Sequence, residues 1–146
     1  MTHCRLIVTL AAVAIALATG AAAGGGPGRA LEAALLAAEG RFIWEDARQD
    51  YIFSDRSGLF ELLSPMPESD LPILVACIDD PRPARATLDG APVTLGVVCY
   101  QALRLVAYVE ATGWPGHIEP LASPAERSAA KRAWQAVLAE GRYVLS

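Results

Sequence analysis

The sequence has few of the residues that usually carry enzyme chemistry. It contains two histidines and three cysteines, and residues 24–146 retain only His117, two cysteines and one lysine, Lys131. No Gly-x-Ser-x-Gly, His-Glu-x-x-His, phosphate-binding loop or dinucleotide fingerprint is present. A zinc site would need more histidine or cysteine ligands. The sequence therefore predicts no cofactor, no metal and no motif-based catalytic residue.

A hydrophobic run long enough to cross a membrane is also missing. The apolar stretch Leu6–Leu17 is shorter than the roughly 20 residues that a spanning helix needs. Arg5 precedes it, and the small residues Ala21-Ala22-Ala23 follow it, as at a cleavage site. We expect a signal peptide over residues 1–23, cleaved near Ala23, and a periplasmic or secreted protein without stable membrane insertion. The alternative is that residues 6–23 remain as an uncleaved anchor.

Positive charge is scarce as well. The chain has 12 basic and 16 acidic residues, a net charge of −4. Arg5 is the one charged residue of the predicted leader, so residues 24–146 hold 11 basic and 16 acidic residues, a net −5. Phosphate contacts need clustered Lys and Arg. This balance excludes a general nucleic-acid binder.

Two cysteines remain after the predicted leader, Cys77 and Cys99. An even number in an exported protein favours a disulfide, and predicted helices flank both residues, so the pair can meet. The bond would close a loop of 22 residues and stabilise the fold by about 3 kcal/mol. The alternative is two buried free thiols.

The apolar spacing predicts a mostly α domain over residues 30–146, with four to five helices and a short β-hairpin, after a flexible stub at 24–29. Helices are expected over 30–39, over 95–111 and after the capping box Ser123-Pro124-Ala125-Glu126. Residues 41–53 favour a helix, although their aromatic residues would also suit an extended segment.

Smaller signals complete the predicted fold. Residues 59–63 suit a short helical turn, and Asp70 and Thr94 are candidate N-caps of the helices that follow them. Asp89-Gly90 predicts a two-residue hairpin turn. Gly141 suits a helix C-cap.

Two groups of residues are weak candidates for binding. Asp79 and Asp80 follow a predicted helix, and Arg82 and Arg85 come soon after, so ion pairs that clasp the loop are the simpler interpretation. Trp114 and His117 lie in a compact turn, where His117 could act as a general base or lie at the surface without a role.

Further side chains have simpler explanations. Five aromatic residues could line a ligand groove, but a place in the hydrophobic core is the simpler interpretation. They are Trp44, Tyr51, Phe53, Phe60 and Tyr100. A solvated helix surface explains the basic side chains Arg127, Lys131 and Arg132.

Several stretches resemble a group of small exported bacterial proteins of unknown function, over roughly residues 68–143. The resemblance lies in Leu71–Cys77, Asp79–Pro83, Thr87–Gly90 with Pro92-Val93, Leu95–Leu103, Trp114-Pro115-Gly116 and Ala130–Trp134. It implies a bacterial envelope protein and brings no activity and no catalytic residues.

Two hypotheses about function therefore remain. One is a non-catalytic binding or accessory protein with a protein partner in the cell envelope. The other is a small hydrolase-like envelope enzyme using His117 with Asp79 or Asp80.

Overall fold

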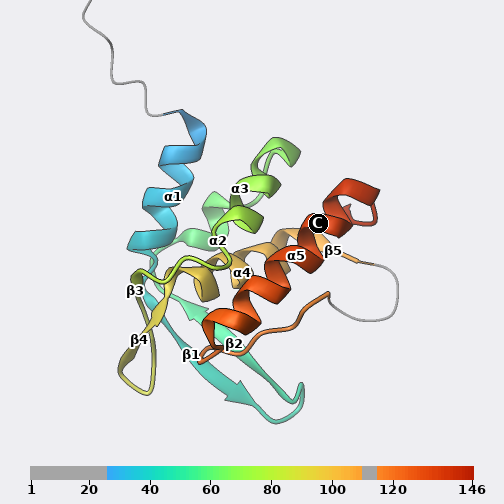
Figure 1. Ribbon diagram of the computed structural model, residues 1–146. Coiled ribbons are helices and arrows are strands. Elements are labelled where there is room, and N and C mark those ends of the chain that lie inside the picture. The colour runs from blue at the N-terminus through green and yellow to red at the C-terminus, as the bar shows by residue number, and fades with distance from the viewer. Residues whose placement is uncertain (1–25, 110–114) are drawn as a thin grey trace, which may run out of the picture.

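The fold is mixed α/β. The computed structural model describes residues 26–109 and 115–146, so the predicted leader and Trp114 lie outside the described residues. The elements are α1 (Pro27–Ala37), β1 (Gly40–Glu45), β2 (Asp50–Asp55), α2 (Leu59–Leu62), the 3₁₀ turn η1 (Glu68–Asp70), α3 (Leu71–Ala76), β3 (Pro83–Leu88), β4 (Ala91–Thr94), α4 (Leu95–Val106), β5 (Ala107–Tyr108), α5 (Pro124–Glu140) and β6 (Val144–Leu145) (Figure 1). The prediction of a mostly α domain is wrong.

The main sheet joins two hairpins. Its strand order is β2-β1-β3-β4, with antiparallel pairs at both edges and a parallel pair, β1 with β3, in the middle. The parallel register places Arg41 beside Thr87 and Phe42 beside Leu88. A separate small sheet pairs β5 with β6. The predicted two-stranded hairpin is therefore half of a larger sheet.

The first hairpin replaces the helix expected over residues 41–53. Phe42 and Phe53 face each other across β1 and β2 and are buried, and Trp44 faces Tyr51 with ring centroids 5.2 Å apart. Such cross-strand aromatic pairs stabilise a sheet. The aromatic spacing fits both helix and strand, and pairing with a second strand decided between them. Trp44 remains 43% exposed.

The second hairpin follows its sequence signal. Asp89 and Gly90 connect β3 to β4 and have φ of 51° and 82°. Two positive φ values are what the favoured two-residue turn requires, and they explain the Asp-Gly pair. The prediction of a hairpin turn here is confirmed.

The helix ends show which of the predicted capping residues do cap a helix. The capping box at α5 is confirmed, with Ser123 and Glu126 bonded to each other's backbone N–H, and Gly141 ends the helix in the left-handed conformation. Asp70 and Thr94 precede α3 and α4, but neither side chain makes a capping bond. The predicted caps are wrong, because η1 continues into α3, and loop carbonyls satisfy the start of α4.

Two helix boundaries also differ from prediction. α1 begins at Pro27, so residues 27–29 belong to the helix and not to a stub. α4 ends at Val106 instead of continuing to residue 111, because the chain becomes extended at Ala107 and pairs with the C-terminal strand β6. The C-terminal tail is therefore a strand.

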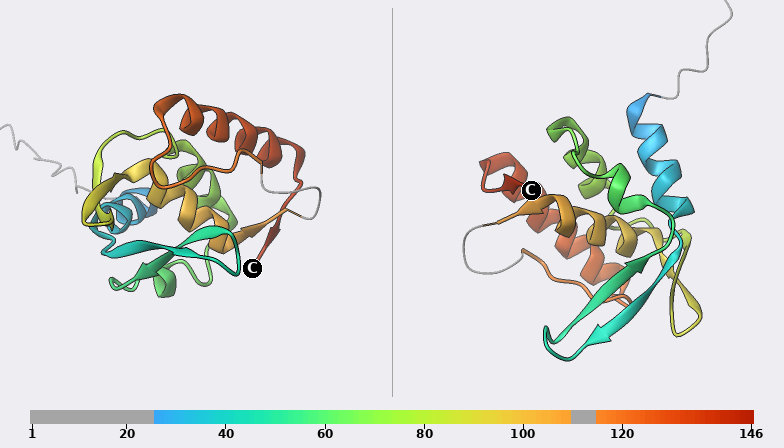
Figure 2. Two further views of the ribbon diagram at one scale, coloured as in Figure 1. Left: turned by 90° about the horizontal axis from the view of Figure 1, so that it is seen from below. Right: turned by 180° about the vertical axis from the view of Figure 1, so that it is seen from behind.

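The molecule is layered. α4 packs on β3 and β4, and α3 contacts both α4 and α5, so the sheet, α4 and α5 follow one another in the left view of Figure 2. The core between these layers includes the fully buried side chains Leu35, Leu71, Leu74, Ile78, Leu95, Tyr100, Leu103 and Trp134. One side of the sheet thus faces the core, and the other faces solvent.

Among residues 26–109 and 115–146, the helices are all too short or too polar to span a bilayer.

Candidate functional site

The disulfide joins the end of α3 to the start of α4. Cys77 and Cys99 are bonded, with their Cα atoms 6.0 Å apart, so this prediction is confirmed. The half-buried Cys77 directly follows α3, and the buried Cys99 lies on α4. The bond fits an oxidising compartment.

α4 approaches the loop after α3 very closely at Gly96. A Cβ built on Gly96 would lie 2.1 Å from the carbonyl oxygen of Ile78, so any other residue would force the backbone to move. The N–H of Gly96 donates to the carbonyl oxygen of Asp80 (3.1 Å), and that of Leu95 donates to Arg82 (2.7 Å). These bonds replace the side-chain cap expected from Thr94.

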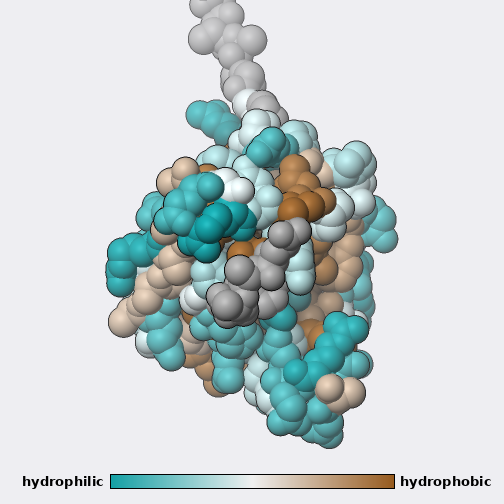
Figure 3. All heavy atoms as spheres, turned by 90° about the vertical axis from the view of Figure 1, so that its right-hand side faces the viewer, coloured by the Kyte–Doolittle hydropathy of each residue, from teal (hydrophilic) through white to brown (hydrophobic). Residues whose placement is uncertain are grey.

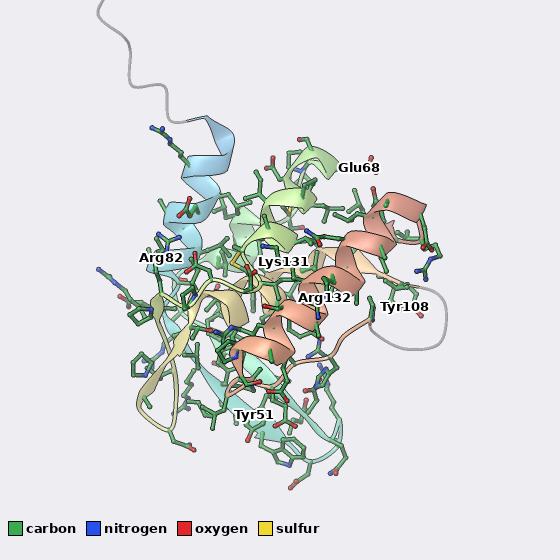
Figure 4. The ribbon with its side chains drawn as sticks, in the orientation of Figure 1. Tyr51, Glu68, Arg82, Tyr108, Lys131 and Arg132 are labelled. Carbon is green, nitrogen blue, oxygen red and sulfur yellow. A yellow bond between two sulfur atoms is a disulfide. The ribbon has the colours of Figure 1, made fainter. Side chains whose placement is uncertain are left out.

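A network of ion pairs, here called the charged clasp, surrounds this junction. It consists of Glu32, Asp79, Asp80, Arg82 and Lys131. Arg82 donates to Asp80 through Nε (3.1 Å) and Nη2 (2.8 Å), and also to Glu32 of α1 (2.6 Å). Lys131 of α5 donates to Asp79 (2.8 Å). In Figure 4, Arg82 and Lys131 lie on either side of the loop region that follows α3.

The clasp leaves its aspartates with intramolecular partners. Bonding to the Arg82 side chain lowers the pKa of Asp80, and burial opposes this shift. The predicted pairing with Arg82 is present, whereas Arg85 pairs instead with Glu39. The geometry makes the clasp a structural junction of α1, α5 and the loop between α3 and β3.

The basic side chains on α5 have different environments. Arg127 is buried and donates to the carbonyl oxygen of Ala122 at 2.6 Å, and Lys131 belongs to the clasp. The prediction of a solvated surface therefore fails for Arg127 and holds for the exposed Arg132.

His117 lies in a second polar group, with residues that the sequence did not associate with it. Its Nδ1 is 3.3 Å from the hydroxyl of Tyr100, and its Nε2 is 3.6 Å from a carboxylate oxygen of Asp50. Arg104 of α4 donates to the other oxygen of Asp50 at 2.6 Å. This group ties the loop at 115–120 to β2 and α4. Neither Asp79 nor Asp80 is among the contacts of His117.

The residues around His117 form a compact polar group. Burial raises the pKa of Tyr100 to about 12, so its hydroxyl stays protonated at neutral pH. The cavity lined by Asp50, Tyr100 and Arg104 has a volume of about 10 Å³, which is room for about one water molecule. His117 has a carboxylate neighbour, but it does not line this cavity, and its side chain is 45% exposed.

The solvent side of the main sheet carries arginines. We call the surface around Arg41, Arg56 and Arg85 the arginine face. Arg41 lies between Ser54 of β2 and Thr87 of β3, and the N–H of Arg56 donates to the carbonyl oxygen of Glu39 at 2.7 Å. Arg41 thus lies on β1, Arg85 lies on the neighbouring strand β3, and Arg56 directly follows β2 on the other side of β1.

Two hollows lie beside these residues, and the second is lined by side chains from both faces of the sheet. One, of about 560 Å³, is lined by Glu39, Gly40, Arg56, Ala84, Arg85, Thr87 and Pro92. The other, of about 460 Å³, is lined by Arg41, Phe42, Ile43, Trp44, Tyr51, Thr87, Leu88, Asp89 and Gly90. Thr87 lines both, so the hollows are neighbours.

The arginines here are poorly paired. Arg85 lies 3.1 Å from Glu39, but both side chains are more than half exposed, and such a pair contributes little in water. The exposed side chains of Arg41 and Arg56 form no ion pair or hydrogen bond with any described residue. Sequence reasoning missed this surface because it assigned residues 41–53 to a helix. The signal was the alternation of Arg41 and Ile43 with Phe42 and Trp44.

Exposed hydrophobic side chains occur on another side of the molecule. Leu105, Tyr108 and Val144 are exposed around β5 and β6. Figure 3 shows hydrophobic residues there as separate areas among hydrophilic ones.

Comparison of the chain with protein-family models, with curated proteins and with solved structures finds no match.

Proposed function

We propose that this is an exported, non-catalytic binding or accessory protein of the cell envelope, and that the arginine face is its binding surface. The observation that carries the proposal is the pair of exposed arginines, Arg41 and Arg56, which have no partner among the described residues beside two open hollows. In the charged clasp, by contrast, the acidic and basic groups are already paired.

The disulfide and the leader support the export part of this proposal. A stable disulfide is typical of oxidising compartments, and the resemblance to small exported bacterial proteins implies the same location. Mass spectrometry of the protein isolated from its envelope tests both features. We expect an N-terminus near Gly24 and a mass two hydrogens below that of the reduced chain. A retained Met1 would contradict cleavage.

Site-specific photo-crosslinking tests the binding surface. A photoreactive residue replaces Thr87, which lines both hollows, and a matched one replaces Gln135, which is exposed on α5. We expect a defined adduct in the native envelope from position 87 and none from position 135. The same adducts from both positions, or none from position 87, would refute the proposal.

A second candidate function is a small hydrolase-like enzyme using His117. Its support is now the contact of His117 with Asp50, in place of the expected contact with Asp79 or Asp80. Replacing His117 by Ala tests it: an enzyme of this kind loses its hydrolytic activity, and a binding protein retains its envelope adduct.

A further inference from the structure

We infer that the arginine face docks an acidic segment of a partner protein, with at least two carboxylates on the arginines and an apolar side chain on Ile43 and Ile52. This inference rests on the proposed function and adds the chemistry of the partner. It follows from the arrangement of side chains across the strands, from the arginines on this face and from the openness of the surface.

The register orders the surface into rows. Ser54, Arg41, Thr87 and Pro92 lie side by side across the four strands. Ile43 and Ile52 are paired two residues further along β1 and β2, and Ile43 is 37% exposed. A surface with cationic and hydroxyl groups in one row and aliphatic groups in the next suits a ligand with both acidic and apolar groups.

The charges on this face favour carboxylates as the main contact. Guanidinium groups bind carboxylates through two parallel hydrogen bonds. Arg41 and Arg56 form no such bond with a described residue, and among the described residues Arg85 is paired with the exposed carboxylate of Glu39. Glu39 therefore occupies the position that a partner carboxylate would take on Arg85, and it competes with the partner.

The openness of the face favours a segment with several carboxylates over one small anion. A single ion pair exposed to water contributes about 1 kcal/mol or less. Several carboxylates on one chain bind together, because the first contact raises the effective concentration of the next.

Peptide binding tests this chemistry on the purified, disulfide-bonded protein. The probe is a fluorescent decapeptide in which Glu alternates with Leu, and its control carries Gln in place of Glu. We expect only the Glu peptide to bind, with an affinity that falls as salt increases. Backbone amide shifts in NMR should change on β1 and β3 and stay unchanged on α5.

Charge variants sharpen the test. The double variant Arg41→Glu with Arg85→Glu should weaken binding by about tenfold or more, because two attractions become repulsions. Glu39→Gln should strengthen binding by about threefold, because it removes the competing carboxylate. Arg132→Glu, on α5 on the far side of the molecule from the sheet, is the charge-matched control for the single variant Arg41→Glu and should leave the affinity unchanged (Figures 2 and 4). Thermal unfolding checks that all variants fold.

Four outcomes would overturn the inference. Equal binding of the Glu and Gln peptides excludes carboxylate recognition. Equal loss in the Arg132→Glu variant shows a net-charge effect without a site. Tighter, arginine-dependent binding to phosphatidylglycerol vesicles than to the peptide identifies a lipid surface. If the adduct from position 87 forms equally well with both arginines reversed, the proposed function stands and the acidic partner falls.

Discussion

Around the disulfide, acidic and basic side chains are paired with each other, whereas on the arginine face two of three arginine side chains form no ion pair or hydrogen bond with a described residue. Both regions consist of ordinary charged residues close to a well-packed core. In the charged clasp, Asp80, Arg82 and Glu32 hold distant parts of the chain together. On the arginine face, Arg41 and Arg56 hold nothing within the described residues. The charged clasp therefore joins parts of the fold, and we propose that the arginine face binds a partner.

The largest effect should come from removing the disulfide beside the clasp. We expect Cys99→Ala to lower the free energy of unfolding by about 2–5 kcal/mol under oxidising conditions. Denaturant unfolding with and without reductant measures this difference. In the Cys77→Ala, Cys99→Ala double variant, reductant should have no effect. Equal stability of the unmodified protein with and without reductant would contradict the prediction.

The next effect should come from the close approach of α4 to the loop. Gly96→Ala places a methyl group against the carbonyl oxygen of Ile78, and overpacking of this kind costs about 1–3 kcal/mol. Denaturant unfolding checks the loss. Ala136→Leu, which adds a side chain at an exposed position of α5, should change stability by less than about 0.5 kcal/mol. Equal effects would show that the contact is not tight.

Breaking one clasp pair should have a smaller, pH-dependent effect. Asp80→Asn should cost about 1 kcal/mol at pH 7, within the range for accessible ion pairs. Because the pKa of Asp80 in the fold lies below its ordinary 3.8, its contribution is present above that value and disappears as the pH falls through the lower folded-state pKa.

Unfolding measured from pH 7 down to pH 3 checks this sign. The stability difference between the original protein and Asp80→Asn should shrink on acidification. Glu119→Gln, at an exposed carboxylate in the loop before α5, serves as the control and should show little difference at any pH. A difference that grows as the pH falls would mean that Arg82 does not stabilise the Asp80 carboxylate.

The smallest effect on stability, and the sharpest contrast with the clasp, is expected on the arginine face. Arg41→Glu should change the free energy of unfolding by less than about 0.5 kcal/mol and yet reduce the envelope adduct formed from position 87. Arg132→Glu should change neither. A large loss of stability in Arg41→Glu would mean that this arginine belongs to the fold, and the contrast between the two regions would disappear.

Local signals were predictable from the sequence. The turn at Asp89-Gly90, the capping box at Ser123 and the pairing of Cys77 with Cys99 each depend on a few residues or on a simple count. The turn and the capping box are correct because neighbouring residues determine their geometry. The disulfide is correct because two cysteines allow a single pairing.

Nonlocal contacts were not predictable. The pairing of β1 with β3 brings Arg41 beside Thr87, and the bond between Lys131 and Asp79 spans 52 positions. Neither has a local signature. For residues 41–53 the aromatic spacing fits both the helical and the strand period. The segment forms strands because it pairs with strands elsewhere in the chain. The arginine face could be recognised only after these strands were placed.

The parallel joint between β1 and β3 also bears on how the molecule assembles. Both cysteines lie in the continuous segment that runs from α3 through the second hairpin to α4, residues 71–106, and β1 and β2 lie outside it. That segment contains its own turn and its own covalent link, and it meets the first hairpin at the joint in the middle of the sheet. The covalent link therefore lies within one continuous segment of the chain, whereas the arginine face needs both hairpins and the noncovalent joint between them.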